Sequence, residues 1–122
     1  DEITLATSTS VLTIGNGEIT SERIDAKDFT LASAPISALV GGDATENARI
    51  TKAIFAGEKG APRDAVLLNA AAAIAAFDGD MTQGIHERIS KSLAKAIAAV
   101  DSGAASKLLD RWVALSQELA VN

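Results

Sequence analysis

The segment from Pro62 to Phe77 constrains the fold most, because it is apolar on nearly all of its faces. A helix without a clear polar face belongs in the middle of a structure, where neighbouring elements cover it on several sides. Pro62 suits the first turn of a helix, and Asp78-Gly79-Asp80 ends the segment. We therefore expect a central helix over 62–77, with the other elements packed around it.

Two polar features of this segment are candidates for a function. Asn69 interrupts the apolar run, and a buried amide without a hydrogen bond costs roughly 1–3 kcal/mol. We expect its side chain to tie the helix to a neighbouring backbone, with a catalytic role as the less favoured alternative. Arg63-Asp64 is interpreted as a solvated helix start in which Asp64 favours the helix dipole, and alternatively as an anion contact.

Three more helices are predicted around the central one. Asp43 is a good N-cap, and Glu46 three residues later completes a capping-box pattern for a helix that ends near Ala56. Asp80 with Gln83 can cap the next helix, and a last helix follows Ser102-Gly103. The expected buried residues of these helices are Ala48, Ile50, Ala53 and Ile54, then Ile85, Ile89, Leu93, Ile97 and Val100, and finally Leu108, Leu109, Trp112, Val113, Leu115 and Leu119.

The first thirty or so residues have β character. Val11–Ile14 is β-branched and apolar, and Asn16-Gly17 tolerates the positive φ angles of a tight hairpin. Glu18–Ile24 alternates imperfectly, which predicts a bulge or a register break, and Ile3 and Leu5 could form a further short strand. A two-stranded ribbon is marginal alone in water, so these residues are expected to be edge strands of a larger sheet.

Composition disfavours several classes of protein. The net charge of −5 disfavours a nucleic-acid binder. The longest apolar run, 65–77, is too short to span a bilayer. The chain has no cysteine, so it has no disulfide or thiolate metal site, which is compatible with a cytoplasmic location. His86 is the only histidine, so a familiar zinc site is excluded, and we expect a partly exposed helix residue there.

Four stretches in a fixed order carry a family resemblance. They are DEIT at 1–4, GGDATENA at 41–48, GAPRDAVLLNAAA at 60–72 and DSGAA at 101–105. Together they resemble the C-terminal part of the anthranilate phosphoribosyltransferase family, from Asp1 to about Leu119. No single stretch is diagnostic, but the four in this order and at matching spacing are difficult to obtain by chance.

The resemblance implies an α/β fold, with a central sheet flanked by helices and attached to a smaller helical domain. Residues 1–122 would then form the C-terminal part of the α/β domain, mainly β over 1–30 and mainly helical over 31–122. On this interpretation the chain contributes a β hairpin or edge strands followed by about four α-helices. The helical domain, the substrate loops and the region through which the family forms homodimers would lie upstream of the chain.

The resemblance also implies an activity. The family transfers the phosphoribosyl group of 5-phosphoribosyl-1-diphosphate to anthranilate in tryptophan biosynthesis, with Mg²⁺ bound by an Asp-Glu pair that matches Asp1 and Glu2. Hard carboxylate oxygens suit Mg²⁺, which keeps several waters and bridges to a diphosphate. The family's diphosphate loop also ends in Gly-Gly-Asp but lies upstream of that pair, so Gly41-Gly42-Asp43 is interpreted as a helix stop and an N-cap.

Two alternatives remain open at this point. The parent protein could be a paralogous phosphoribosyltransferase with another aromatic acceptor, because the residues that set acceptor specificity would lie upstream. The chain could instead be a non-catalytic helical interaction module with its hairpin as a docking edge. Under the main interpretation, the isolated chain is expected to be inactive and to bind Mg²⁺ negligibly without the diphosphate.

Overall fold

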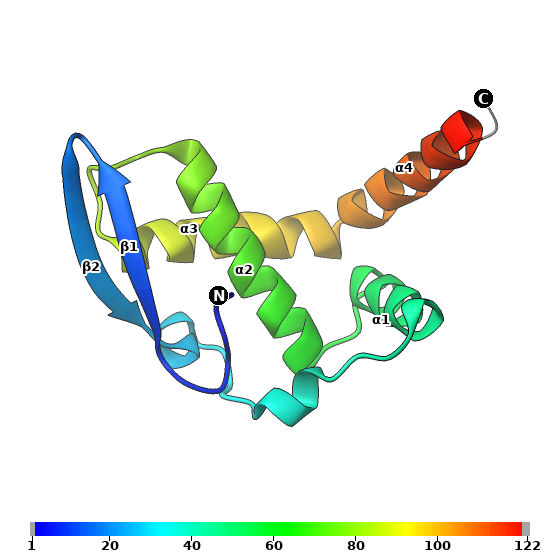
Figure 1. Cartoon of the computed structure of the whole chain (residues 1–122), viewed down its shortest axis with the longest axis horizontal. Helices are drawn as coiled ribbons and strands as arrows, with labels where there is room; N and C mark the ends of the chain where they lie inside the picture. Colours follow the sequence, from blue (N-terminus) through cyan, green and yellow to red (C-terminus); the bar gives the residue numbers. More distant parts are fainter. Residues whose placement is uncertain (1, 121–122) are drawn as a thin grey trace.

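The computed structural model describes residues 2–120, which form a β hairpin followed by four α-helices, as the sequence predicted (Figure 1). The two strands come first and are followed by two short 3-10 helices. The bounds of the elements are β1 Thr9–Gly15, β2 Glu18–Ile24, η1 Ala26–Phe29, η2 Ile36–Leu39, α1 Ala44–Phe55, α2 Ala61–Asp78, α3 Ile85–Asp101 and α4 Ala104–Ala120.

The hairpin turns where the sequence predicted. Asn16 and Gly17 both have positive φ, 51° and 81°, which is the backbone of a tight two-residue hairpin turn. The antiparallel pairing runs without interruption from Thr9 opposite Ile24 to Gly15 opposite Glu18, so the predicted bulge is wrong. One face of the ribbon exposes three large apolar side chains, those of Leu12, Ile14 and Ile19.

The segment before the hairpin is not a strand, contrary to the expectation for Ile3 and Leu5. Leu5 is 1% exposed, and its carbonyl accepts a hydrogen bond from the Ala34 amide at 3.1 Å. The segment is therefore fixed by burial and by single hydrogen bonds to other parts of the chain.

The core lies where α2 crosses α3 (Figure 1). The central helix forms as predicted, and neighbouring elements cover it on most of its sides, as expected. The exception is a narrow exposed stripe that includes Val66 and Phe77, which are 41% and 91% exposed. The buried contact consists of Leu67, Leu68, Ala71 and Ala75 from α2 and Ile85, Ile89, Leu93, Ala96 and Val100 from α3, joined by Leu5, Ile24, Ala26 and Phe29.

The remaining helix predictions hold in part. The α3 stripe is buried as expected, with Ile97 half-buried, whereas α1 buries only Ile54 of its four predicted residues. No side chain caps α3, which begins after Gly84. Asp80, the predicted cap, instead accepts hydrogen bonds from the Thr82 amide and hydroxyl at 3.0 and 2.5 Å.

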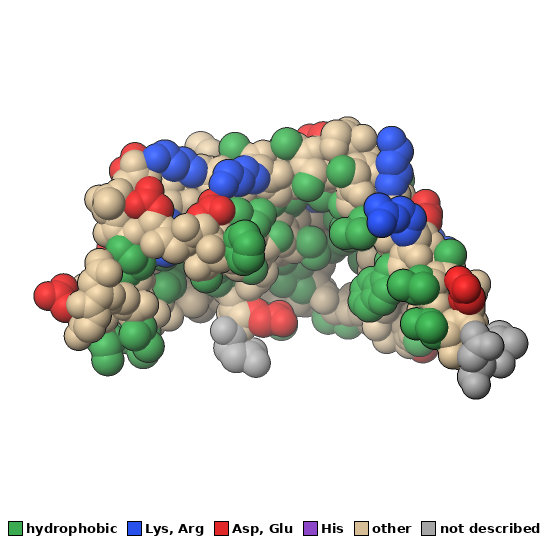
Figure 2. All heavy atoms as spheres, turned by 90° about the horizontal axis from the view of Figure 1, so that it is seen from above, with side chains coloured by type: hydrophobic (Ala, Val, Ile, Leu, Met, Phe, Trp, Pro, Cys, Tyr) green, Lys and Arg blue, Asp and Glu red, His purple; other side chains and the backbone are tan. Residues whose placement is uncertain are grey.

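Helix α4 leaves the body of the molecule, and its predicted burial is wrong. The chain turns at Gly103, which has a φ of 74°, and within the described residues only the first turns of α4 contact α1 and α3, so Leu109 is half-buried and the other predicted residues of its stripe are exposed. Figure 2 shows green side chains along this arm at the right of the molecule. The exposed large apolar residues of α4 are Leu108, Trp112, Val113, Leu115 and Leu119.

Gly60, directly before α2, is a position where a side chain is expected to destabilise the fold. Its φ of 129° with ψ of −179° is a backbone conformation that essentially only glycine adopts. Gly60→Ala should lower the free energy of unfolding by about 1–3 kcal/mol. The measurement is urea denaturation followed by circular dichroism.

Gly84→Ala is the matched control for this substitution, because Gly84 directly precedes α3 with an ordinary φ of −64° and has open space around it. Alanine lowers the entropy of the unfolded chain, which stabilises the protein, but it is a weaker N-cap than glycine, which destabilises it. These effects offset each other, so the free energy of unfolding should change by no more than about 0.5 kcal/mol. Equal effects at the two glycines would show that backbone strain at Gly60 is not the cause.

Candidate functional site

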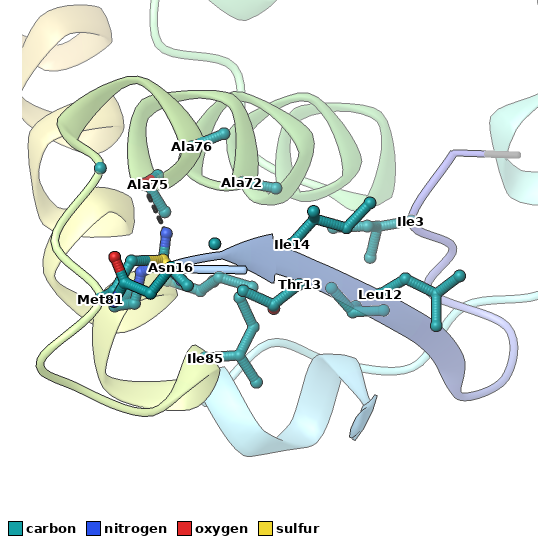
Figure 3. A pocket seen from close by; sticks show the side chains of 15 residues that line it. Ile3, Leu12, Thr13, Ile14, Asn16, Ala72, Ala75, Ala76, Met81 and Ile85 are labelled. Atoms are coloured by element: carbon teal, nitrogen blue, oxygen red, sulfur yellow. Dashed lines mark hydrogen bonds between the residues drawn. The ribbon is translucent and has the colours of Figure 1, made fainter. Parts of the chain in front are cut away.

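The acidic pair predicted to bind metal lies at the start of the chain. Asp1 is outside the described residues, and Glu2 is exposed. Directly after it, the Ile3 backbone is bound on both of its polar groups by the Asn69 side chain. The Ile3 amide donates to Asn69 Oδ1 at 2.9 Å, and Asn69 Nδ2 donates to the Ile3 carbonyl at 2.8 Å. Figure 3 shows Ile3 between β1 and α2.

Asn69 thus has the role that the sequence predicted, because its amide ties α2 to a backbone segment 66 residues away in the chain. Its Nδ2 also donates to the Ala65 carbonyl, one turn earlier in α2, at 3.0 Å. The amide is part-buried, and all three of its hydrogen bonds are made to backbone groups. Asn69 therefore has a structural role at Ile3, the residue directly after Glu2.

The donor set at the start of the chain suits magnesium. Residues 2–120 contain no group of three or more His, Cys, Asp or Glu side chains that could hold a metal ion. Mg²⁺ does not need such a group, because it is usually bound by one or two carboxylates together with waters and phosphate oxygens. The exposed carboxylate of Glu2, on a backbone fixed at the next residue, fits that chemistry, and binding by Asp1 and Glu2 stays a prediction.

The glycine pair before α1, Gly41-Gly42, lies in a loop whose backbone is hydrogen-bonded by the Asn47 side chain. Asn47 Oδ1 accepts from the Gly42 amide at 2.9 Å, and Asn47 Nδ2 donates to the Gly42 carbonyl at 2.9 Å. Asp43 caps α1 by accepting from the Glu46 amide at 2.9 Å, while the Glu46 carboxylate binds Arg49. The amide groups of Gly42 and Glu46 are therefore engaged within the protein, which confirms the N-cap. The preceding 3-10 helix already ends at Leu39, so the glycine pair is not the position where it stops.

Arg63 is not the solvated residue that the sequence predicted, since its side chain is 3% exposed. Its Nη2 donates to Asp101 Oδ1 at 2.7 Å, which joins the start of α2 to the end of α3. Nη1 of the same side chain is buried and has no hydrogen-bond partner in residues 2–120. The hydrogen bond from Arg63 holds the pKa of the Asp101 carboxyl below its usual value of 3.8, despite a smaller opposing effect of desolvation.

This ion pair predicts a specific acid dependence of stability. Because the pKa of Asp101 is lowered in the folded state, its contribution to stability is complete above the unfolded pKa, near 4, and is lost as the pH falls through the lower folded value. The difference in melting temperature between wild type and Asp101→Asn should therefore be constant above about pH 5 and shrink below about pH 4.

Asp110→Asn, on the exposed helix α4, is the control for the acid dependence, and its melting temperature should follow that of wild type throughout. Thermal unfolding at several pH values between about 2.5 and 7 would separate the two carboxylates. A difference for Asp101→Asn that does not change with pH would contradict the assignment of the ion pair.

His86 and Trp112 lie on the surface. His86 is half-exposed, as predicted; its ring stacks on Phe29 and its Nε2 lies 3.2 Å from Asp28 Oδ2. Trp112 was expected to anchor the last helix in the core, but it is 69% exposed on α4. Neither ring belongs to a cluster of titratable groups with a plausible catalytic geometry among the described residues.

A cavity of about 390 Å³ lies between the hairpin and helices α2 and α3 (Figure 3). Its lining is mostly apolar, and its one charged member is Arg88, whose Nη2 donates to the Ala75 carbonyl at 3.0 Å. The burial of Arg88 was missed, although its position three residues after Ile85 places it on the α3 stripe. The cavity gathers no pair of groups suited to acid–base chemistry, so we assign it no catalytic role.

Comparison with known proteins shows where this structure belongs. Residues 1–106 match the family described as "Glycosyl transferase family, a/b domain". The chain is 43% identical over 122 residues to the anthranilate phosphoribosyltransferase of Rhodococcus jostii (strain RHA1), covering all of this chain and 34% of that protein. It is 45% identical over 119 residues to the enzyme of the same name from Saccharopolyspora erythraea, covering 98% of this chain and 34% of that protein.

A third relative gives the same result. The anthranilate phosphoribosyltransferase of Rhodococcus opacus (strain B4) is 43% identical over 120 residues, which are 98% of this chain and 33% of that protein. The chain thus spans about a third of the length of these relatives. Among residues 2–120, no helix has both the length and the hydropathy that crossing a membrane requires. The matched range and these identities place the chain in the glycosyl transferase family, in its a/b domain.

Proposed function

We propose that the protein containing this chain is an anthranilate phosphoribosyltransferase. It joins anthranilate to 5-phosphoribosyl-1-diphosphate and releases N-(5′-phosphoribosyl)anthranilate and diphosphate, as a cytoplasmic enzyme of tryptophan biosynthesis. The observation that carries the proposal is the identity of 43–45% to proteins of that name over nearly every residue of the chain. The acidic pair that begins the chain supports the proposal, because its chemistry suits a magnesium diphosphate.

The proposed reaction needs no covalent enzyme intermediate. The anthranilate amine attacks the anomeric carbon of the ribose as the bond to the diphosphate breaks, and the amine loses its proton. Magnesium, when bound, neutralises negative charge that grows on the leaving diphosphate. In this chain, Asp1 and Glu2 are the residues that would supply carboxylate oxygens to it.

The length of the chain indicates which part of the proposed active site it can contribute. Residues 2–120 contain no group of three or more His, Cys, Asp or Glu side chains that could hold a metal ion, and the chain matches only 34% of the Rhodococcus jostii relative. We therefore propose that the substrates are bound mainly by the other part of the full-length protein, and that this chain supplies the carboxylates and their support. The isolated chain is then expected to be inactive.

The test uses the full-length protein and the fluorescence of anthranilate. Loss of fluorescence that requires both phosphoribosyl diphosphate and Mg²⁺ would support the proposal. A well-folded full-length protein that leaves the fluorescence unchanged would overturn it. The isolated chain serves as a comparison. Turnover of anthranilate by a purified, mass-verified sample of it would contradict the proposal that the substrates are bound mainly by the other part of the full-length protein.

A further inference from the structure

Asn69 binds the residue that immediately follows the acidic pair, and this placement suggests a role beyond holding the fold together. The Ile3 amide and carbonyl, the two polar groups of one residue, both engage the same side-chain amide, at 2.9 and 2.8 Å. Adjacent Cα atoms are only about 3.8 Å apart, so a displacement of Ile3 moves Glu2 with it. The orientation of the Glu2 carboxylate therefore depends on where Asn69 lies.

The position of Asn69 is itself fixed by the core. It lies in the middle of the 18-residue helix α2, directly after Leu67 and Leu68, which are 3% and 0% exposed. Its hydrogen bond to the Ala65 carbonyl at 3.0 Å further fixes the orientation of the amide plane. The backbone next to Glu2 is thereby fixed relative to the α2–α3 core.

Only an amide of this length provides such a contact. A carboxamide offers an acceptor and a donor side by side, whereas a leucine of similar shape offers neither and a serine is too short to reach both groups. Further along the chain, the Thr4 amide donates to Thr9 Oγ1 at 3.5 Å and the Leu5 carbonyl accepts from the Ala34 amide at 3.1 Å. The two Asn69 hydrogen bonds are shorter, and they are made to the residue directly after Glu2. If this contact served only to hold α2 against the Ile3 segment, its loss would change the stability of the fold and leave the metal affinity unchanged.

We infer that Asn69 is a positioning residue for Glu2, one of the two proposed magnesium ligands, and that it acts through the Ile3 backbone. This inference rests on the proposed function, because it takes the metal role of the pair as given. Residues that orient metal ligands without touching the metal typically change metal affinity by 10- to 100-fold when they are substituted.

The test measures metal affinity directly in the full-length protein. Mn²⁺ serves as the probe, with inorganic diphosphate present, and free Mn²⁺ is followed by electron paramagnetic resonance. Asn69→Leu should weaken Mn²⁺ binding by about 10- to 100-fold. In steady-state kinetics the apparent KM for Mg²⁺ should rise similarly, while the KM for anthranilate should stay within about twofold, since Asn69 acts on the metal ligands alone.

Asn47→Leu is the matched control, because Asn47 makes the same two-point contact with the Gly42 backbone, at 2.9 and 2.9 Å, away from the acidic pair. It should leave the Mn²⁺ affinity unchanged. If Asn69→Leu does not fold, Asn69→Ser decides, since its side chain is too short to make both contacts and should weaken Mn²⁺ in the same way. A folded Asn69 variant with wild-type Mn²⁺ affinity would overturn the inference.

Failure of the inference and failure of the proposed function give different results. Glu2→Gln in the same resonance assay should lose Mn²⁺ affinity whatever the role of Asn69. If Glu2→Gln weakens Mn²⁺ and Asn69→Leu does not, the positioning role is wrong and the proposed metal site stands. If Glu2→Gln leaves the affinity unchanged, the metal site of the proposed function is wrong, and the inference about Asn69 is overturned with it.

Discussion

Replacing Glu2 by Gln in the full-length protein is expected, under the proposed function, to lower kcat for phosphoribosyl transfer by at least about 100-fold, because the amide would remove a negatively charged oxygen ligand from the proposed metal. Glu2 is exposed, and its backbone is fixed at the following residue by Asn69, so a substitution of equal size should leave the fold intact. The loss should be accompanied by a higher Mg²⁺ requirement. Initial rates measured by anthranilate fluorescence over a range of Mg²⁺ concentrations would show both effects.

Glu18→Gln is the matched control, since Glu18 is an exposed carboxylate at the start of β2 and has no role in the proposed site. Its kcat and Mg²⁺ dependence should stay within about twofold of wild type, in keeping with the small effects of surface substitutions. An active Glu2→Gln enzyme with an ordinary Mg²⁺ requirement would remove Glu2 from the proposed machinery.

Ile89→Ala should destabilise the chain by about 2–5 kcal/mol, the largest effect on stability that we expect from a single substitution here. Ile89 is 0% exposed and lies in the α3 face that α2 covers. Truncation removes buried methyl and methylene groups and leaves a cavity that two packed helices cannot readily close. Urea denaturation monitored by circular dichroism at 222 nm, a wavelength set by the helical backbone, would measure the change.

Ile36→Ala makes the same chemical change at a site that is 65% exposed, in the 3-10 helix η2. Its free energy of unfolding should lie within about 0.5 kcal/mol of wild type. Comparable losses at Ile36 and Ile89 would mean that the contact between α2 and α3 is not the core of this molecule.

The elements themselves were predictable because their signals are local. Asn16-Gly17 specifies a hairpin turn through the positive φ that both residues tolerate, and the structure shows φ values of 51° and 81° there. Asp43 specifies the start of α1 through a hydrogen bond to an amide three residues away. Each of these signals acts over a few residues, so it can be read without knowledge of the remaining chain.

Burial was harder to predict, because periodicity shows which face of a helix is apolar but not what covers it. The stripe of α3 is covered by α2, whereas the similar stripe of α4 that includes Leu108 and Trp112 is exposed, at 62% and 69% for these two residues. Nothing in the local pattern distinguishes the two helices. The partner of an apolar face is a property of the whole fold.

The candidate site divides in the same way. The cost of burying an unpaired amide was enough to predict that Asn69 binds a backbone, but not that the backbone belongs to Ile3, 66 residues away. The burial of Arg63 escaped prediction because its partner Asp101 is 38 residues away. For a buried polar group, the sequence can predict that a hydrogen-bond partner is needed. Which residue is the partner depends on the fold when the two are far apart in the chain.

Trp112 determines what ultraviolet emission reports about this chain. It is the only tryptophan, the chain has no tyrosine, and its indole ring is 69% exposed on α4. The emission therefore comes from an arm that lies outside the α2–α3 core, and its wavelength follows the polarity around that arm (Figure 2). Unfolding of the core alone would leave the wavelength of maximum emission nearly unchanged. Any molecule that covers the apolar stripe of α4 would shift this wavelength towards the blue.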